Sequence, residues 1–460
     1  MIPSRTAWRD ALAKRSRVSV LVVGAGINGA GTFRDLALQG VDVALIDRGD
    51  FCSGASAAPS RLIHGGLKYL ETGEFRLVAE SAHERNRLLA NAPHYVKPLR
   101  TAVPIHSWFG GIVPSIKRFL GRPATLNDRG IVITELGMIL YDIFGRHQRS
   151  MPRHHLTLRR ATRSRLPALR PDVIATATYY DARVTLPERL NLELITDTLR
   201  DCPEALACNY VALERREGHR LILKDTLSGE RLTLEADLVI NAGGAWIDGI
   251  NQALGQPSRY MGGTKGSHLV LDHPELARQL DDGMVYFGTD DGRICLAYPL
   301  FDRVLVGSTD LVCPDPDSAQ CTDEEERYML EAMAELFPGL HFDSSQVCHR
   351  YSGVRPLPAS DADQPGQVSR DHSIAEDALT DGPRVLSLIG GKWTTFRGFS
   401  EQACDRALTL LGRERRCSTR DLPIGGGRDY PAAKSLRERT AELEEGIASI
   451  RTSTTKRDVN

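Results

Sequence analysis

The predicted fold rests on one stretch of sequence, Val18-Ser19-Val20-Leu21-Val22-Val23 followed directly by Gly24-Ala25-Gly26-Ile27-Asn28-Gly29. Its first half is mostly apolar and rich in β-branched side chains, which is typical of a buried parallel strand. A helical pattern then continues to Gly40, and a second strand over residues 41–46 leads to Asp47. This stretch has the order of elements that a dinucleotide-binding motif needs: a strand, a G-x-G-x-x-G turn, a helix, a second strand and an acidic residue.

The residues of this motif have separate physical roles. Gly24 allows the tight turn, Gly26 lets backbone amides approach a pyrophosphate, and Gly29 lets the helix pack close to the strand. Asn28 lies in the first turn of the helix, whose N-terminus offers unpaired N–H groups and partial positive charge to phosphates. Asp47 is placed to accept hydrogen bonds from an adenosine ribose. The alternative interpretation is a structural βαβ turn without a ligand.

Three further segments distinguish FAD from NAD. In chain order they are Ser60-Arg61-Leu62-Ile63-His64-Gly65-Gly66-Leu67-Lys68-Tyr69-Leu70 with Ser56 before it, Tyr351-Ser352-Gly353-Val354-Arg355-Pro356-Leu357, and Gly390-Gly391-Lys392-Trp393-Thr394-Thr395. Together with the fingerprint they resemble the FAD-dependent glycerol-3-phosphate dehydrogenases, which are flavoproteins of the glutathione-reductase type related to D-amino-acid oxidase. The resemblance extends over residues 18–427, nearly the whole chain.

The resemblance implies an FAD-dependent oxidoreductase. Enzymes of this family oxidise sn-glycerol 3-phosphate to dihydroxyacetone phosphate by hydride transfer to the flavin, and the electrons pass to quinone or to oxygen. Two other functions stay open. One is an FAD-dependent oxidase or dehydrogenase of a different small anionic hydroxy or amino substrate, and the other is a flavin-binding protein without turnover.

The fold class that we expect from the motif and the resemblance is α/β. Since 460 residues exceed one ordinary hydrophobic core, two or more lobes are expected. The resemblance implies a discontinuous Rossmann-like FAD-binding domain over residues 18–100, 165–255 and 350–427. A helical insertion is expected over 101–164 and a substrate-binding domain with a mixed or antiparallel sheet over 256–349. A short helical tail over 428–460 follows, where related proteins carry a larger helical domain that we expect to be mostly absent.

Charge, cysteine content and the lengths of apolar runs indicate which partners and which cellular compartment to expect. The formal net charge is −1, which gives no bulk attraction to nucleic acid. Nine scattered cysteines without a C-x-x-C pair or metal-ligand spacing favour reduced thiols in the cytoplasm and no bound metal. Residues 1–17 lack the apolar region of a signal peptide, and no apolar run approaches a spanning helix. Peripheral attachment at the inner face of the membrane and a homodimer stay open.

The region from Trp108 to Phe144 has two apolar stretches. Residues 112–122 alternate apolar and basic side chains, and residues 131–144 form a second apolar run. Helices that pack in the core or between lobes are one interpretation. A peripheral membrane or quinone-access surface and an interface with a partner protein are the others.

The resemblance also implies which residues contact FAD. Beyond the fingerprint these are Ser56, Ser60, Arg61, His64, Gly65, Gly66, Gly243, Trp246, Gly391, Lys392 and Thr394. Gly243 and Trp246 follow an apolar strand that is expected to close over the nucleotide, although a plain strand–turn–helix is the other interpretation. For His64 the alternative is packing of the loop.

Flavin oxidation of a secondary alcohol needs a base for the hydroxyl proton and positive charge beside the reduced flavin. The resemblance places His268 near the reacting hydroxyl, where a neutral imidazole is a suitable base; a hydrogen-bonded core histidine is the alternative. Arg355, expected in a compact turn, is the candidate clamp for a phosphate. Its alternative is an ordinary ion pair. Lys392 is expected near the flavin, where its charge acts with a helix N-terminus.

Further substrate contacts are implied for Lys68, Tyr69 and Arg370, although Arg370 has Asp371 as an alternative partner. The sequence departs from the family pattern at Lys68, where an arginine is usual, and a lysine cannot bind a phosphate through a planar fork. In the preceding loop, alanine and proline replace the usual serines at positions 57 and 59, which leaves Ser56 and Ser60 as candidate pyrophosphate contacts.

Overall fold

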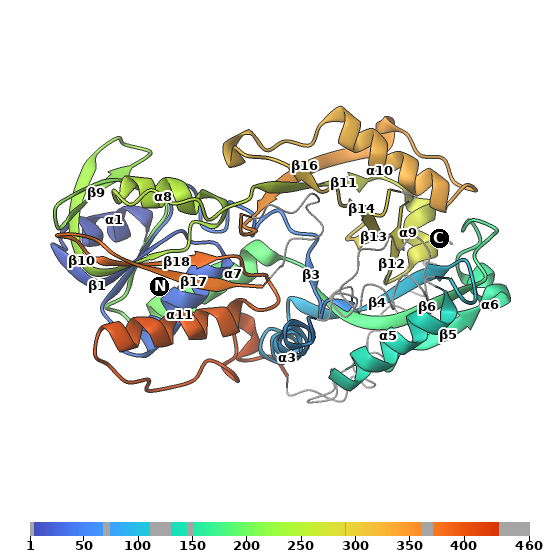
Figure 1. Ribbon diagram of the computed structural model, residues 1–460, viewed down its shortest axis with the longest axis horizontal. Helices are drawn as coiled ribbons and strands as arrows, with labels where there is room; N and C mark the ends of the chain where they lie inside the picture. The colour runs from blue at the N-terminus through green and yellow to red at the C-terminus, as the bar shows by residue number, and fades with distance from the viewer. Residues whose placement is uncertain are drawn as a thin grey trace, which may run out of the picture.

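The computed structural model describes residues 4–67, 74–110, 130–144, 151–289, 291–359 and 371–431. These residues form two lobes, each built around its own β-sheet (Figure 1). One sheet is parallel at its centre, and the other is largely antiparallel. The α/β class with a Rossmann-like part and a mixed sheet, which the sequence predicted, is therefore confirmed.

The first lobe contains the predicted fingerprint strand. Within the described residues its sheet has eight strands: β1 (Arg17–Val23), β2 (Val43–Ile46), β7 (Leu206–Cys208), β8 (Val211–Glu217), β9 (Arg220–Asp225), β10 (Arg231–Asn241), β17 (Ser373–Ala378) and β18 (Arg384–Ile389). The parallel order is β18-β10-β1-β2-β7, so β1 lies at the centre. β17 is antiparallel to β18, and β8 and β9 form an antiparallel extension of β10.

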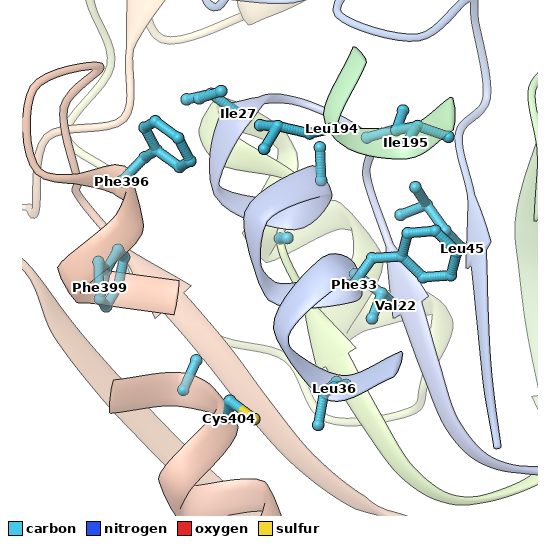
Figure 2. Close-up of a cluster of buried hydrophobic side chains, with 14 of the residues drawn as sticks. Val22, Ile27, Phe33, Leu36, Leu45, Leu194, Ile195, Phe396, Phe399 and Cys404 are labelled. Carbon is cyan, nitrogen blue, oxygen red and sulfur yellow. The ribbon is translucent and has the colours of Figure 1, made fainter. Parts of the chain in front are cut away.

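Helices cover one face of this sheet. They are α2 (Ile27–Leu38), α7 (Pro187–Asp201) and α11 (Phe396–Leu410). Figure 2 shows Phe33 of α2 beside Val22 and Leu45 of the sheet, with Phe396 and Phe399 of α11 on the other side of the helix. Both faces of β1 are covered, which explains why its sequence is a continuous apolar run rather than an alternating one.

The opposite face packs against α1 (Arg5–Ala13), against the β8–β9 extension, and against α8 (Ile247–Ala253), which the short helix η2 (Gly244–Trp246) joins to β10. Leu21 and Val23 of β1 lie in this second core cluster together with Leu12 of α1. The centre of the lobe is therefore a three-layer arrangement, and the edge of the sheet at the carboxyl ends of the parallel strands carries the loops.

The second lobe holds a sheet of ten strands within the described residues. They are β3 (Leu62–Ile63), β4 (Val96–Ile105), β5 (His155–Leu158), β6 (Ala175–Val184), β11 (Thr264–Leu271), β12 (Gly283–Gly288), β13 (Ile294–Leu300), β14 (Arg303–Gly307), β15 (Leu311–Val312) and β16 (Val347–Arg355). β12 and β4 are parallel, and the other pairs are antiparallel.

Two groups of helices cover this second sheet. One contains α6 (Arg159–Arg165), α9 (Pro274–Leu280) and α10 (Asp323–Leu336) with the short helix η4 (Ser344–Gln346), and the other contains α3 (Phe75–Asn91) and α5 (Ile131–Phe144). The short helix η3 (Pro316–Ser318) lies between β15 and α10 in the chain. α3 joins the lobes, because Leu88 lies in the core cluster of the first lobe and Val78 in a cluster with β6 and α5. The short helix η6 (Gly425–Gly427) ends near α7.

Several local expectations differ from the structure. Strands β3 and β6 and the first half of β4 lie in ranges assigned to the FAD-binding domain, but they pair in the second sheet. The reason is that β4 and β6 pair over their whole length, and a sequence pattern does not specify the partner of a strand. The expected helical insertion also contains strand β5, which pairs with β6. The domain division itself stays a prediction.

Other expectations concern the membrane and the ends of the chain. Within the described residues, no helix combines the length and the apolar composition needed to cross a membrane. The amphipathic stretch 112–122 lies outside the described residues, as does most of the expected C-terminal tail. α5 corresponds to the second apolar run; it buries Met138 and Tyr141 against the second sheet, whereas Leu136 and Ile143 are exposed.

Candidate active site

A cavity of about 980 Å³ is lined by residues of both lobes. Its volume is at the upper end of the range of about 300–1,000 Å³ found for ligand and cofactor sites. The first lobe contributes the glycine turn after β1 and the segment after β18, and the second lobe contributes residues of β11 and β16. The dinucleotide motif and the predicted catalytic side chains therefore line the same cavity.

The glycine turn has the close backbone approaches that the motif predicts. Gly24 has a φ of +103°, and a Cβ there would lie 2.6 Å from the carbonyl oxygen of Ala242. A Cβ on Gly29 would overlap the carbonyl oxygen of Gly24, so this glycine lets α2 pack against the turn. Gly26 caps α2 without a side-chain hydrogen bond, and a Cβ there would lie 3.1 Å from Oγ of Ser56. The turn fits a pyrophosphate at the helix N-terminus.

Asp47 and Ser56 support the start of α2. The carboxylate of Asp47 accepts hydrogen bonds from the N–H of Ala25 at 2.7 Å and of Gly49 at 2.9 Å. Burial raises the pKa of Asp47, although these two bonds act in the opposite direction. The hydroxyl of Ser56 accepts a hydrogen bond from the N–H of Ile27 at 3.0 Å. Both side chains line the cavity beside the helix N-terminus.

The segment after β18 lines the cavity beside the first turn of α2. Gly391 has a φ of +91°, and a Cβ there would overlap the side-chain amide of Asn28. Nδ2 of Asn28 donates to the carbonyl of Gly390 at 3.3 Å. Oδ1 of Asn28 is buried and has no hydrogen-bond partner within the described residues. A buried acceptor in the cavity wall is a polar contact that a bound cofactor can satisfy.

Gly243 and Trp246 line the cavity after β10, and their contact with the nucleotide stays a prediction. The indole N–H of Trp246 donates to Oδ1 of Asp317 at 3.0 Å, and the guanidinium of Arg48 lies 4.5 Å from the centre of the indole ring. Arg48 and Asp317 also form an ion pair. Since Asp317 belongs to η3, this contact joins the two lobes at an exposed part of the cavity.

His268 lies in the middle of β11, where its side chain is 2% exposed and lines the cavity. Nε2 lies 2.7 Å from Oγ of Ser60, and the ring stacks on Tyr351 with centroids 5.0 Å apart. Nδ1 is buried, with no hydrogen-bond partner in the described part of the chain. Burial lowers the pKa of the imidazole to about 3, and the positive charges of Arg355 and Arg61 act in the same direction. The ring is therefore neutral near pH 7.

Arg355 is the last residue of β16, which corrects the expected compact turn. Pairing of β16 with β11 continues to this position, opposite Thr264, and keeps the backbone extended. Nη1 donates to Oδ1 of Asp310 at 2.8 Å, and Nη2 donates to the carbonyl of Thr309 at 3.0 Å. The ion pair that the sequence left as an alternative is therefore present, while the guanidinium also lines the cavity.

Lys392, His64 and Thr394 also line the cavity. Nζ of Lys392 donates to Oγ of Ser81 in α3 at 3.2 Å. The hydroxyl of Thr394 accepts a hydrogen bond from the backbone N–H of His64 at 3.0 Å. This bond connects the loop after β3 with the segment before α11, so the loop with His64 is held against the cavity wall.

Among the predicted site residues, Arg61 does not line the cavity, and three others lie outside the described residues. Arg61 directs its guanidinium toward α7, where Nη2 lies 3.7 Å from Oε1 of Glu188, and it is absent from the described cavity lining. Lys68, Tyr69 and Arg370 lie outside the described residues. Their predicted substrate contacts stay predictions.

Gly65 belongs to a buried polar network, and neither Gly65 nor Gly66 is part of the described cavity lining. The N–H of Gly65 donates to the hydroxyl of Tyr141 at 2.8 Å and to Oδ1 of Asp181 at 3.2 Å. Asp181 is paired with Arg85 of α3 at 2.7 Å, and both side chains are almost fully buried. This network fixes the backbone after β3 between α3, α5 and β6.

A family model for FAD dependent oxidoreductases, named DAO, matches residues 19–395 of the chain. The chain belongs to this family. The FAD-dependent oxidoreductase predicted from the sequence is therefore confirmed, and FAD is its cofactor.

Individual relatives of this FAD-dependent oxidoreductase support the finer resemblance. A glycerol-3-phosphate dehydrogenase of Synechocystis sp. (strain ATCC 27184 / PCC 6803 / Kazusa) is 34% identical over 435 residues, which cover 90% of this chain and 74% of that protein. An aerobic glycerol-3-phosphate dehydrogenase of Bacillus subtilis (strain 168) is 28% identical over 440 residues, 94% of this chain and 75% of that protein. The resemblance to the glycerol-3-phosphate dehydrogenases is confirmed.

Solved structures share the fold of this FAD-dependent oxidoreductase. The glycerol-3-phosphate dehydrogenase from Bacillus halodurans complexed with FAD has a TM-score of 0.69 at 24% identity, covering 96% of this chain and 73% of that chain. The L-alpha-glycerophosphate oxidase from Mycoplasma pneumoniae with FAD bound has a TM-score of 0.60 at 16% identity, covering 90% of this chain and 98% of that chain.

The residues that orient Arg355 were not predicted from the sequence. Glu325, in the first turn of α10, is 3% exposed. Its carboxylate accepts hydrogen bonds from Lys265 Nζ at 2.7 Å, Ser267 Oγ at 2.8 Å and Thr309 Oγ1 at 2.6 Å. Since the carbonyl of Thr309 accepts from Arg355, this buried network connects α10 with the loop that holds the guanidinium.

The alternation of β11 could have indicated this network. Gly266 and His268 line the cavity, so Lys265 and Ser267, which alternate with them along the strand, must face the other side. A lysine on the covered side of a sheet needs a buried partner, which Glu325 supplies.

Gly266→Ala is expected to lower kcat/KM by about 10–100-fold, because a displacement near 1 Å can cost that much. The added Cβ would overlap Nη2 of Arg355 and lie 2.6 Å from its Cζ. The guanidinium ends a flexible side chain, so it moves and the fold is retained. Gly288→Ala on β12 is the matched control, since its Cβ would meet the carbonyl oxygen of Arg293 only at 3.9 Å. Equal kinetics of the two variants would contradict the expectation.

The low pKa of His268 predicts a pH-dependent stability. The unfolded imidazole has a pKa near 6.5, so between pH 6.5 and about 3 the unfolded chain binds one more proton than the folded chain. This residue therefore lowers the free energy of unfolding by about 1.4 kcal/mol per pH unit as the pH falls below 6.5. Denaturant unfolding at pH 7, 6 and 5 should show a shallower loss for His268→Gln than for the wild type. Parallel losses would contradict the assignment.

Proposed function

We propose that this enzyme oxidises sn-glycerol 3-phosphate to dihydroxyacetone phosphate. The observation that carries the proposal is the cavity itself, which places a dinucleotide turn at the start of α2 together with His268, Arg355 and Lys392 in one lining. A base, a guanidinium and an ammonium in one site are the groups that a phosphorylated secondary alcohol requires.

FAD, when bound, accepts the hydride from the carbon that carries the hydroxyl. Gly24, Gly26 and the N-terminus of α2 hold its pyrophosphate, and Asp47 holds the adenosine ribose. Gly29 allows the packing that this turn requires. The remaining predicted contacts are Asn28, Ser56, Ser60, Arg61, His64, Gly65, Gly66, Gly243, Trp246, Gly391, Lys392 and Thr394. Arg61, Gly65 and Gly66 act through the loop that carries them rather than through the cavity wall.

His268 takes the proton of the substrate hydroxyl. Its neutral ring has a free lone pair near pH 7, which a base needs. Arg355 clamps the phosphate, with Asp310 and Thr309 holding its guanidinium in orientation. Lys392 adds positive charge where the flavin becomes negative. Lys68, Tyr69 and Arg370 complete the substrate site.

The electron acceptor in this proposal is quinone or oxygen. We further propose that the protein is cytoplasmic, that it contacts the membrane peripherally, and that it forms a homodimer. One observation supports a membrane contact. On α5 the side chains of Val132, Leu136, Ile139 and Ile143 are exposed at helical spacing. Trp108 and Phe109 are also exposed, and the carbonyl of Trp108 accepts a hydrogen bond from the N–H of Val132 at the start of α5. An outward apolar stripe of this kind suits the interfacial region of a bilayer.

Anaerobic reduction of the flavin tests the proposed substrate. The FAD-loaded protein is mixed in the absence of oxygen with one of four compounds. These are sn-glycerol 3-phosphate, its enantiomer sn-glycerol 1-phosphate, glycerol, and a small amino acid. Bleaching of the flavin absorption by sn-glycerol 3-phosphate alone is the expected result. Bleaching by another compound would change the substrate, and reduction only by dithionite would indicate a protein without turnover. Reoxidation with oxygen or with a soluble quinone then identifies the acceptor.

A further inference from the structure

Ser60 connects the loop of the first lobe with the sheet of the second lobe. Its Oγ lies 2.7 Å from Nε2 of His268 on β11, and its carbonyl accepts a hydrogen bond from the hydroxyl of Tyr298 on β13 at 3.0 Å. The carbonyl of the preceding Pro59 accepts from the hydroxyl of Tyr351 on β16, also at 3.0 Å. Three strands of the second sheet therefore fix the position of Ser60, although the sequence analysis assigned this serine to the pyrophosphate.

The surroundings of His268 leave its Nε2 edge toward Ser60. The ring face stacks on Tyr351, and a Cβ on Gly307 would overlap Cδ2, so the backbone of β14 lies against the ring. Nδ1 is buried without a hydrogen-bond partner among the described residues. Ser60 itself lines the cavity. A proton that moves from the cavity to Nε2 therefore meets the hydroxyl of Ser60.

We propose that Ser60 is a catalytic proton relay between the substrate hydroxyl and His268. The hydroxyl of Ser60 gives its proton to Nε2, and its Oγ takes the proton of the substrate hydroxyl. One O–H bond of the substrate breaks, the O–H bond of Ser60 is replaced, and one N–H bond forms on His268. The hydride goes to the FAD of this family, so protons and electrons balance. This assignment rests on the proposed function, because it gives the route of the proton that the oxidation releases.

The relay also predicts the tautomer of His268 in the resting enzyme. If the hydroxyl of Ser60 donates to Nε2, the proton of the neutral ring must lie on Nδ1. Nitrogen-15 NMR of histidine-labelled, FAD-loaded protein measures which ring nitrogen is protonated, and His268→Gln identifies the signal. We expect a protonated Nδ1 and an unprotonated Nε2 in the wild type. The reverse tautomer would overturn the relay, and this result needs no substrate.

The kinetic test compares Ser60→Ala, Ser60→Thr and Ser56→Ala. Ser56 is the matched control, because its hydroxyl contacts the start of α2 and not the imidazole. Ser60→Ala should slow anaerobic flavin reduction by about 10–100-fold, since a positioned proton transfer contributes at least this much. Ser60→Thr, which retains a hydroxyl, should recover most of the rate. Ser56→Ala should instead weaken FAD binding.

Mixtures of H₂O and D₂O separate a relay from a structural role. Two protons move in the wild type, so its reduction rate should depend on the deuterium fraction along a curve. In Ser60→Ala one proton moves, and the dependence should become a straight line. A straight line in the wild type, an unchanged curve in Ser60→Ala, or loss of FAD affinity with a normal reduction rate would each overturn the relay. Wild-type protein that sn-glycerol 3-phosphate does not reduce would contradict the proposed function instead.

Discussion

Arg355→Ala is expected to lower kcat/KM for sn-glycerol 3-phosphate by about 30- to 5,000-fold, which corresponds to about 2–5 kcal/mol. The phosphate of the substrate carries about 1.5–2 negative charges near pH 7. Without the guanidinium, this charge lacks a main partner in a cavity that is partly shielded from water. Anaerobic stopped-flow reduction over a range of substrate concentrations measures the loss. Arg355→Lys should recover only part of it, because an ammonium lacks the planar fork.

A control on the same strand distinguishes the clamp from a general loss of charge. Arg350 lies five positions before Arg355 on β16, and its side chain is exposed and paired with Asp323 and Glu326. Arg350→Ala should leave the reduction kinetics at the wild-type level. If Arg355→Ala also reduces like the wild type, the guanidinium serves only its ion pair with Asp310, and the phosphate-clamp assignment is wrong.

The local features of the fold could be predicted because neighbouring residues determine them. A turn that needs a positive φ at position 24 and no Cβ at position 29 requires glycine, whatever the rest of the chain does. The unbroken apolar run of β1 likewise follows from helices on one face of its sheet and an antiparallel extension on the other. The residues that meet these constraints lie close together in the sequence, so the dinucleotide-binding motif could be predicted without the structure.

The partners of the reacting side chains could not be predicted, because they are distant in sequence. Ser60 meets His268 across 208 positions, and Arg355 meets Asp310 across 45. These contacts depend on the pairing of strands and on the docking of one lobe against the other, which local propensity does not specify. The same limit explains Gly65. Its place in the family motif indicated FAD, whereas its N–H is used by a buried network with Tyr141 of a separate helix.

The strand position of Arg355 shows a related limit. The glycine and proline around it favour a turn by local chemistry, yet ladder pairing with β11 keeps the residues up to Arg355 extended. Tertiary pairing therefore outweighed the local preference, and it placed the guanidinium beside Gly266, where the absence of a Cβ makes room for it.

His268→Ala is expected to slow flavin reduction by about 10²–10⁴-fold while FAD stays bound. In the free enzyme, burial and the charges of Arg355 and Arg61 keep the pKa of this imidazole low, so it is a weak base. A bound dianion opposes the effect of Arg355 and stabilises the protonated ring, which raises the basicity of His268 only when the substrate is present. The pH profile of kcat/KM, which reports the free enzyme, should therefore show no inflection from His268 between pH 5 and 8.

A buried histidine elsewhere in the second lobe provides the matched control for this prediction. His273 is 6% exposed and accepts a hydrogen bond from the N–H of Leu276 at the start of α9. His273→Ala removes this helix cap, so it should lower the free energy of unfolding by about 0.5–2 kcal/mol and leave flavin reduction at the wild-type rate. His268→Ala should show the opposite balance, with a large kinetic loss. If His268→Ala loses stability but reduces its flavin at the wild-type rate, His268 is a core histidine and another group removes the proton.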